Sequence, residues 1–350
     1  MRLTLLIKLL LTALTVWLSV ACSGANSVSP DQATTPSVTD SEDCRIVQHE
    51  IGETEVCGQP QNVVVLGPNM LELILALGVQ PAGFGDRFTF HSGDYDNPAQ
   101  QIPYLGEWIT SQPANVGLVY SPSLEAIAKT QPDLILGSHF SEAQYENLSQ
   151  IAPTLLFEWF DTEVNLRAIA AAVGRPERVD PLLAEMEQQV VSAQSEFAPV
   201  VAEHPKVLML MSNSQMNQFT LLPGRFSFCD TLVADLGFQL VLPTGTAESA
   251  LNRPVPISLE TLPQLNEADS IILLGYNEQA TQLTDIDEFE QNQLQSFQQR
   301  WQENAIAQSL DASQSGRVYF VPTYVCGATP GPIGTELYLE ELQKKLLSEQ

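Results

Sequence analysis

Eight side chains could build a small-molecule binding site, because each lies in a predicted loop near the end of a predicted strand. In open α/β sheets, ligands bind beyond the carboxyl ends of the strands. Flat aromatic rings supply apolar contact area at low entropic cost, and guanidinium groups supply paired donors for negatively charged oxygens. These residue types predict a cleft for a bulky, partly apolar ligand, built from Arg87, Tyr104, Trp108, His139, Trp159, Arg225, Tyr276 and Tyr324. The alternative is that the arginines offset an acidic surface and the rings pack in the core.

The four histidines bear on a second kind of site, one for a bare metal ion. Such a site usually needs three or four ligands from histidine and carboxylate. His49 lies in a predicted hairpin and His204 at the end of a predicted helix, so neither faces the cleft. Only His91 and His139 could, and we assign no metal ligands.

Enzyme motifs are missing from the sequence. There is no G-x-S-x-G, no G-x-G-x-x-G and no P-loop pattern. Ser227 precedes Phe228 and Cys229 but has no obvious base. We therefore expect neither catalysis nor a cofactor, although a fold of this type can host an enzyme.

Two stretches, 123–137 and 258–275, follow the same pattern and must position these loops. Each begins with Ser-Leu-Glu, which is typical of a helix start, and each continues to an Asp before an apolar run that ends in Gly. Such a run is typical of a buried parallel strand. The two copies lie about 135 residues apart and favour two similar α/β lobes over two unrelated helix–strand pairs.

A long helix is predicted between the lobes. Asp180 and Pro181 form a typical start, and apolar residues then recur every three or four positions as far as Phe197. Pro199 should kink or end the helix. The predicted fold is α/β, with two doubly wound lobes joined by this helix and a ligand cleft between them. The predicted boundaries are 44–160 for the first lobe, 161–204 for the connecting segment and 205–350 for the second lobe.

Charge and the first residues predict an extracytoplasmic location. Residues 1–21 resemble a signal peptide with Arg2, Lys8 and an apolar core too short to span a bilayer, followed by Cys22. We expect Cys22 to carry a lipid anchor, with plain secretion as the alternative, and 22–43 to form a disordered tether. Removing residues 1–21 lowers the net charge from −27 to −29, which argues against nucleic acid as a partner.

Four further cysteines in an exported chain could form two disulfides in three possible pairings. Cys44 and Cys57 flank a hairpin-like segment with Gly52 near its turn, so the two should lie opposite each other. Elimination then pairs Cys229 with Cys326, although both could remain free thiols.

Several motifs, in this order, resemble a known family. They are 45–52, 77–83, Ser-Leu-Glu at 123 and 258, Pro-Asp-Leu-Ile at 132, 316–319 and Gly-Pro at 331. Together they are similar to the class III substrate-binding proteins of ABC importers for ferric siderophores, haem and cobalamin. The resemblance covers about residues 45–347 and implies a lipoprotein monomer that captures a ferric siderophore outside the cytoplasmic membrane. Haem, bound through His139 or Tyr324, and cobalamin stay as alternative ligands.

The resemblance also implies partners, namely a membrane-embedded permease and its ATPase. Glu125 and Glu260 occupy matching positions in the two repeated stretches, and the family implies that such acids meet arginines of the permease. The alternative is that each acid only stabilises the start of its own helix.

Overall fold

The computed structural model describes residues 43–347 except Ser214, Asn217, 247–251 and 278–285. The predicted signal peptide, the predicted lipid-bearing Cys22 and nearly all of the tether lie outside the described residues. Within the described residues, no helix combines the length and the apolar character that a membrane crossing requires.

The described chain begins with a hairpin of β1 (Cys44–His49) and β2 (Gly52–Cys57). Cys44 lies opposite Cys57 in the antiparallel register, and the two form a disulfide with an S–S distance of 2.02 Å. Arg45 reaches from this hairpin to the carbonyls of Ala171 and Ala172, at the end of α5 (Thr162–Ala172). A cation at a helix C-terminus is favourable because the last carbonyls there lack helical partners.

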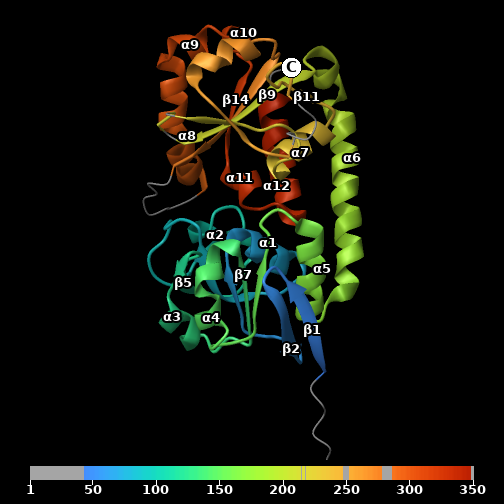
Figure 1. The fold of residues 1–350 in the computed structure, drawn as a ribbon, viewed down its shortest axis with the longest axis vertical. Coiled ribbons are helices and arrows are strands. Elements are labelled where there is room, and N and C mark those ends of the chain that lie inside the picture. Colours follow the sequence, from blue (N-terminus) through green and yellow to red (C-terminus); the bar gives the residue numbers. More distant parts are fainter. Residues whose placement is uncertain (1–42, 214, 217, 247–251, 278–285, 348–350) are drawn as a thin grey trace, which may run out of the picture. The chain divides into compact units, whose positions relative to one another are not determined.

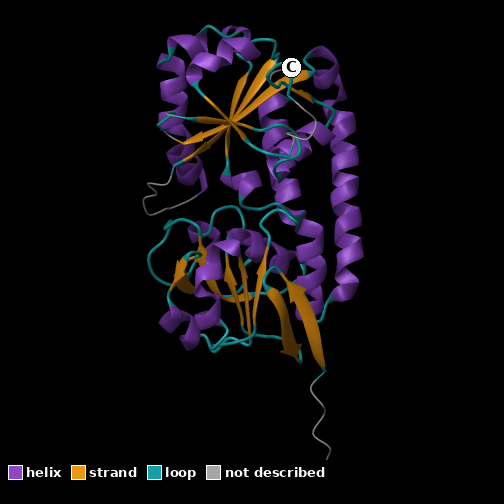
Figure 2. Cartoon of the chain, viewed as in Figure 1, coloured by secondary structure: helices purple, strands orange, loops and turns teal. Residues whose placement is uncertain are grey.

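The first sheet has the order β6-β5-β4-β3-β7-β8, and all neighbouring strands are parallel except β6, which runs antiparallel to β5. Alternate residues of β3 pack into different clusters: Val63 and Val65 on one face, Val64 and Leu66 on the other. Helices therefore cover both faces, as expected for a doubly wound sheet (Figure 2). The strands are β3 (Val63–Leu66), β4 (Pro81–Asp86), β5 (Ala114–Leu118), β6 (Ser121–Pro122), β7 (Leu134–Ser138) and β8 (Thr154–Phe157).

The helices of this lobe are mostly short. Ser123 caps the helix that follows it, because its hydroxyl accepts a hydrogen bond from the backbone N–H of Ala126 at 3.2 Å, as the repeated stretch predicted. The helical segments are α1 (Pro68–Ala76), α2 (Pro98–Gln101), η1 (Gly106–Trp108), α3 (Leu124–Lys129), η2 (His139–Gln144), α4 (Tyr145–Leu148), α5 (Thr162–Ala172) and η3 (Pro176–Arg178).

The long connecting helix is α6 (Val179–Glu203), whose 25 residues span about 37 Å (Figure 1). Val179 and Leu182 pack into the core of the first lobe, whereas Phe197 and Val200 pack into the core of the second. The helix begins just before the predicted start and continues through Pro199 to Glu203. Of the two predicted effects of Pro199, a kink or an end, the end is wrong. Pro199 lies on the exposed side of the helix, where water can satisfy the carbonyl that loses its partner.

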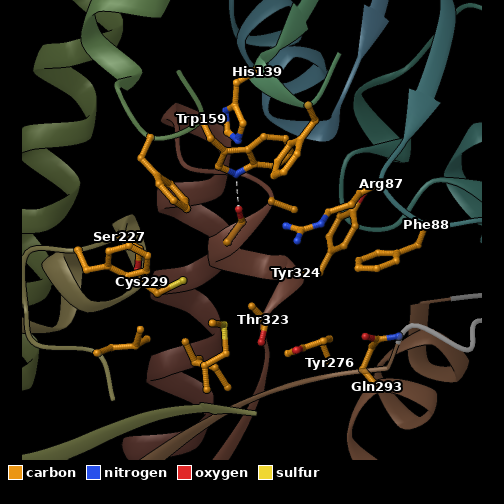
Figure 3. A pocket seen from close by; sticks show the side chains of 18 residues that line it. Arg87, Phe88, His139, Trp159, Ser227, Cys229, Tyr276, Gln293, Thr323 and Tyr324 are labelled. Carbon is orange, nitrogen blue, oxygen red and sulfur yellow. Dashed lines mark hydrogen bonds between the residues drawn. The ribbon is translucent and has the colours of Figure 1, made fainter. Parts of the chain in front are cut away.

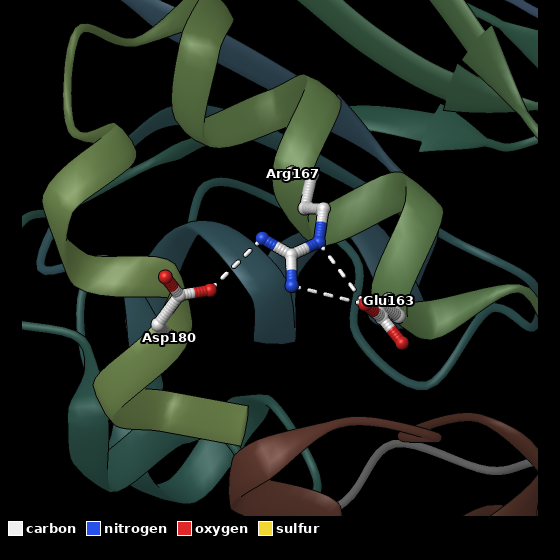
Figure 4. Close-up of polar contacts among 3 residues, drawn as sticks. All are labelled: Glu163, Arg167 and Asp180. Carbon is white, nitrogen blue, oxygen red and sulfur yellow. Dashed lines mark hydrogen bonds and ion pairs between the residues drawn. The ribbon is translucent and has the colours of Figure 1, made fainter. Parts of the chain in front are cut away.

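An exposed ion-pair cluster joins α5 to the start of α6 (Figure 4). The Arg167 guanidinium lies 3.0 Å from the Glu163 carboxylate and 2.9 Å from the Asp180 carboxylate. Both carboxylates raise the pKa of Arg167. All three side chains are at least half exposed, so the cluster orients the two helices more than it stabilises the fold.

The second sheet has the order β12-β10-β9-β13-β14, and β11 also pairs with β9. Its central strands again alternate between two clusters, with Val207 and Met209 on one face and Leu208 and Leu210 on the other. The structure thus has the two predicted doubly wound lobes. The strands are β9 (Lys206–Asn213), β10 (Phe219–Leu221), β11 (Gln239–Leu240), β12 (Val255–Ile257), β13 (Ser270–Tyr276) and β14 (Val318–Pro322).

The second repeated stretch differs from the first in its helix. After Ser258 the chain forms the 3₁₀ helix η5 (Leu259–Leu265), where the first stretch forms an α-helix. Pro263 lies inside η5 and cannot donate a backbone hydrogen bond. The remaining helices are α7 (Phe228–Asp235), α8 (Ile286–Glu303), α9 (Ala305–Gln308), α10 (Asp311–Gln314), α11 (Tyr324–Gly327) and α12 (Pro332–Leu346).

A buried carboxyl group joins α1 to α12. Glu72 is fully buried, and its Oε1 accepts a hydrogen bond of 2.7 Å from the backbone N–H of Gly334. Burial raises the pKa of Glu72 to about 8, against the lowering effect of backbone N–H groups at the start of α12. A Cβ on Gly331 would lie 2.8 Å from Glu72 Oε1, so glycine is needed there for the carboxylate to approach the helix.

Candidate ligand-binding site

A cavity of about 320 Å³ lies beyond the carboxyl ends of strands from both sheets (Figure 3). Its volume is at the lower end of the range usual for small-molecule pockets. Aromatic side chains form much of its wall, together with one arginine and one histidine. The lining residues are Arg87, Phe88, His139, Phe140, Trp159, Phe160, Met211, Leu222, Phe226, Ser227, Cys229, Leu274, Tyr276, Gln293, Thr323, Tyr324, Gly327 and Ala328.

Trp159 is a fixed part of the wall because both lobes hold it. It follows β8 in the first lobe, and its Nε1–H donates a 2.7 Å hydrogen bond to the Gly327 carbonyl at the end of α11 (Figure 3). The Phe140 ring packs against it edge-on at 5.2 Å. Gly67 has φ +122° and lies under the indole, where a Cβ would meet Asn69 Oδ1 at 2.6 Å and Trp159 at 3.5 Å.

Arg87 follows β4 and places its guanidinium beside two rings, 5.1 Å from the centre of Phe140 and 5.6 Å from that of Phe88. Aromatic faces attract a cation at this range. The side chain is otherwise exposed, so its donors can reach a molecule in the cavity.

The neighbouring Asp86 is buried and joins the lobes through Tyr324. The Tyr324 hydroxyl donates to Asp86 Oδ2 at 2.9 Å. Burial raises the pKa of the Asp86 carboxyl from 3.8 to about 7, while the Arg87 backbone N–H, the Tyr324 hydroxyl and the Arg87 charge act in the opposite direction. Asp86 is therefore a group whose charge changes near neutral pH.

Tyr324 also belongs to an aromatic cluster between the lobes. Phe90, Phe289 and Tyr324 meet edge-to-face, with ring centres 5.0 to 5.6 Å apart. Tyr104 stacks on Tyr324 at 6.1 Å and donates a 3.0 Å hydrogen bond to Glu290. The cluster fixes the floor of the cavity to both lobes.

His139 lines the wall beside Phe140. Its ring packs on Phe140 at 4.1 Å, and its Nδ1 lies 4.0 Å from the Glu158 carboxylate. A carboxylate therefore lies beside the imidazole.

Five of the eight predicted ligand-binding residues line this cavity: Arg87, His139, Trp159, Tyr276 and Tyr324. The other three do not. Tyr104 is part of the cluster between the lobes. Trp108 ends η1 on the surface with 37% of its area exposed. Arg225 is exposed, and its charge lowers the pKa of Asp235 against the larger effect of burial.

The residues that the sequence analysis missed are often next to those it named. Phe88, Phe140 and Phe160 each follow a predicted residue, and Phe226 lines the cavity where Arg225 does not. Two consecutive loop residues can point in different directions, and their order alone does not say which one points inward. Gln293 comes from α8, and the sequence pattern predicted no helix around this residue.

Ser227 has a structural role in the start of α7. Its backbone N–H and its hydroxyl both donate to Asp230 Oδ1, at 2.7 and 2.6 Å, in a capping-box arrangement.

Cys229 and Cys326 form a disulfide that joins α7 to α11 beside the cavity. This pairing agrees with the one reached by elimination.

Metal ligands do not gather at the cavity. Across the described part of the chain, the one group of three potential ligands is Cys44, Glu55 and Cys57, in which both thiols belong to a disulfide. His91, named in the sequence analysis, contacts the Asp94 carbonyl at 3.3 Å and does not line the cavity.

The two acids at the repeated helix starts are both exposed. Glu125 pairs with Lys129 at 3.1 Å within α3. The pKa of Glu260 is lowered by its own backbone N–H and by Ser258. Neither residue lines the cavity, so neither is part of the candidate ligand-binding site.

A family described as "periplasmic binding protein" matches residues 63–325. The chain belongs to this family. Among relatives of this periplasmic binding protein, the Fe(3+)-citrate-binding protein YfmC of Bacillus subtilis is 26% identical over 310 residues, which cover 86% of each chain. The ferric-anguibactin-binding protein FatB of Vibrio anguillarum is 24% identical over 73% of this chain and 77% of FatB.

Solved structures agree with the fold of this periplasmic binding protein. Staphylococcus aureus SirA, complexed with staphyloferrin B, superimposes with a TM-score of 0.67 at 22% identity and covers 87% of this chain and 98% of SirA. At that identity the likeness establishes the two-lobe fold. The ligands named for the three proteins differ from one another, so they do not specify the ligand of this chain.

Proposed function

We propose that this protein captures a ferric siderophore outside the cytoplasmic membrane and delivers it to an ABC importer. The observation that carries the proposal is the aromatic cavity with Arg87 in its wall, located between the lobes of a periplasmic binding protein. Relatives named for ferric citrate and ferric anguibactin support the ligand class.

The cavity residues would hold the chelate by shape and by a few directed contacts. Trp159, Tyr276 and Tyr324 offer ring faces and edges, and two of these rings are held by hydrogen bonds to the other lobe. Rings that are fixed before binding lose little entropy on contact with a ligand. Arg87 and His139 would face the chelate's oxygen atoms. The chelate is bound and released unchanged, with no chemical step.

Haem remains a second possible ligand, but the structure weakens one of its two proposed iron ligands. The Tyr324 hydroxyl is buried and donates to Asp86, so it would have to break that bond to coordinate iron. His139 would then be the axial ligand. A haem titration with a Soret band that shifts in wild type and not in His139→Ala would favour this alternative.

Delivery would depend on Glu125 and Glu260, one at the start of α3 and one at the start of η5. Exposed acids on each lobe are placed to meet cations of a permease, and such rim pairs set orientation and association rate. Because neither acid lines the cavity, we expect that docking and ligand binding can be impaired separately.

The test is uptake of a radiolabelled ferric chelate by cells that lack the gene and carry a plasmid copy. Glu125→Lys/Glu260→Lys should abolish uptake while the purified variant keeps wild-type affinity. Glu146→Lys/Glu267→Lys, which changes charge by the same amount at two other exposed positions, is the matched control. Unchanged uptake in the first variant would contradict the docking role.

Anchoring belongs to the same proposal. A lipid on Cys22 and a tether over 23–43 would hold one monomer near the permease. Cys22→Ala should release the protein from washed membranes in a fractionation assay. Retention of the variant in the membrane fraction would contradict the anchor.

A further inference from the structure

The cavity carries little positive charge, which bears on the charge of its ligand. Thirteen Lys and Arg residues follow residue 21, and Arg87 is the one among them that lines the described cavity. Arg87 also follows the buried Asp86 carboxyl in the chain, and its charge lowers the pKa of that group against the larger effect of burial. The other basic side chain of the wall, His139, has Glu158 as its neighbour.

The remaining cations are engaged elsewhere or lie apart from the cavity. Several donate to backbone carbonyls, as Arg45, Arg175 and Arg317 do, and others pair with carboxylates, as Lys206 does with Glu267. Arg225 is the cation next to a lining residue in sequence, and its charge acts on Asp235.

The internal residues that the structure does not describe add no basic side chain. By sequence, 214, 217, 247–251 and 278–285 contain no Lys, Arg or His, and 278–285 includes Glu278 and Asp285. The described residues therefore include every Lys and Arg that follows residue 21.

The field of the whole protein acts in the same direction. With a net charge of −29 after residue 21, the chain repels anions and attracts cations at the distances that govern encounter. An anionic chelate would need several cations in the cavity to offset this repulsion and its own desolvation. One arginine among seven aromatic rings does not supply them.

We propose that the site selects ferric chelates of zero or single positive charge with an apolar exterior, which is the chemistry of trihydroxamates, and that it discriminates against polyanionic chelates. Three hydroxamate groups neutralise the ferric ion, whereas three catecholates leave a trianion. Arg87 would donate to the hydroxamate oxygens, and the rings would cover the carbon skeleton. This inference rests on the proposed function, because it specifies the ligand of the same cavity.

The test compares three ferric complexes by isothermal titration of the mature chain: ferrichrome, which is uncharged; ferrioxamine B, which is monocationic; and ferric enterobactin, which is trianionic. We expect the first two to bind within about tenfold of each other and the third at least about a hundredfold more weakly at low salt. Raising the salt concentration should weaken the binding of ferrioxamine B, because salt screens its attraction to the acidic protein. The binding of ferrichrome should stay nearly unchanged, and any residual binding of ferric enterobactin should become stronger, because salt screens its repulsion.

Two variants separate the cavity from the general field. Arg87→Gln should lower the affinity for ferrichrome about tenfold, because the cavity loses one charged donor. Arg225→Gln, at an exposed position off the cavity wall, should leave the affinity for ferrichrome unchanged. Tighter binding of the trianion than of ferrichrome would overturn this inference and leave the proposed function standing. Absence of binding by all ferric complexes, with the protein folded, would overturn the proposed function itself.

Discussion

Replacement of Tyr324 by Phe tests how the two lobes are joined at the floor of the cavity. The change removes one hydroxyl, which donates a 2.9 Å hydrogen bond to Asp86 in a site where both residues are buried. A hydrogen bond to a neutral group is worth about 1 kcal/mol, and one to a charged group about 1.5–3 kcal/mol. The cost of the substitution therefore depends on whether Asp86 carries its charge.

The pKa of Asp86 sets the direction of this dependence. Because burial raises it from 3.8 to about 7, the folded protein holds a proton that the unfolded chain has released. The stability that this group contributes is present below about pH 4 and is lost as the pH rises through 7. At pH 5 the carboxyl is mostly protonated, and at pH 8 it is mostly ionised.

We therefore expect Tyr324→Phe to lower the free energy of unfolding by about 1 kcal/mol at pH 5 and by about 2–3 kcal/mol at pH 8. Urea unfolding at the two pH values measures the difference. Tyr338→Phe is the matched control, because that hydroxyl is also buried but donates to the Cys229 carbonyl at 3.3 Å, which does not titrate. An equal loss at both pH values for Tyr324→Phe would refute the assignment of Asp86 as the titrating partner.

Two further predictions concern the links that hold each lobe and join one to the other. Replacing Cys229 and Cys326 by Ala should lower the free energy of unfolding by about 1–2 kcal/mol more than replacing Cys44 and Cys57, because the first disulfide closes a segment of 97 residues and the second one of 13. Urea unfolding of the two double variants measures the difference. A larger loss in the Cys44/Cys57 variant would contradict the prediction. Gly331→Ala should cost about 1–3 kcal/mol, because the added Cβ would lie 2.8 Å from Glu72 Oε1. In a Glu72→Ala background the same change should cost much less, and equal costs in the two backgrounds would show that the steric contact is not the cause.

The sheets and the division into two lobes were predictable because they follow from local patterns. Continuous apolar runs such as Val63–Leu66 are buried on both faces, and the repeated stretches led to two similar lobes. Burial requires only that a residue be apolar and correctly spaced, which a single sequence reveals. The fold class was therefore confirmed.

Helix α8 was largely missed, and the reason lies in its position beside the site. Its buried row recurs every four residues as Phe289, Gln293, Phe297 and Trp301, but the polar Gln293 interrupts the apolar pattern. That amide lines the cavity and accepts a 2.9 Å hydrogen bond from the backbone N–H of Asn277. A pattern search based on apolar residues loses the helix at the residue that lines the cavity.

The loops limited the prediction of the site in a different way. Tyr104 has φ +60°, an uncommon conformation for a bulky residue, and it is held there within packing between the lobes. No local signal indicates that turn or its partner Glu290. Arg225 and Phe226 differ by one position, yet only Phe226 lines the cavity.

The most direct test of the central claim, that this cavity holds a ferric chelate, is a tryptophan fluorescence titration. Wild type, Trp108→Phe and Trp159→Phe are titrated with ferrichrome. Isothermal titration calorimetry of the same samples measures binding independently of the fluorescence. The account predicts saturable quenching at submicromolar chelate that survives Trp108→Phe and is largely lost in Trp159→Phe, because Trp159 lies in the cavity wall and Trp108 does not. Quenching that is lost with Trp108 and retained without Trp159 would place the chelate elsewhere and contradict the account.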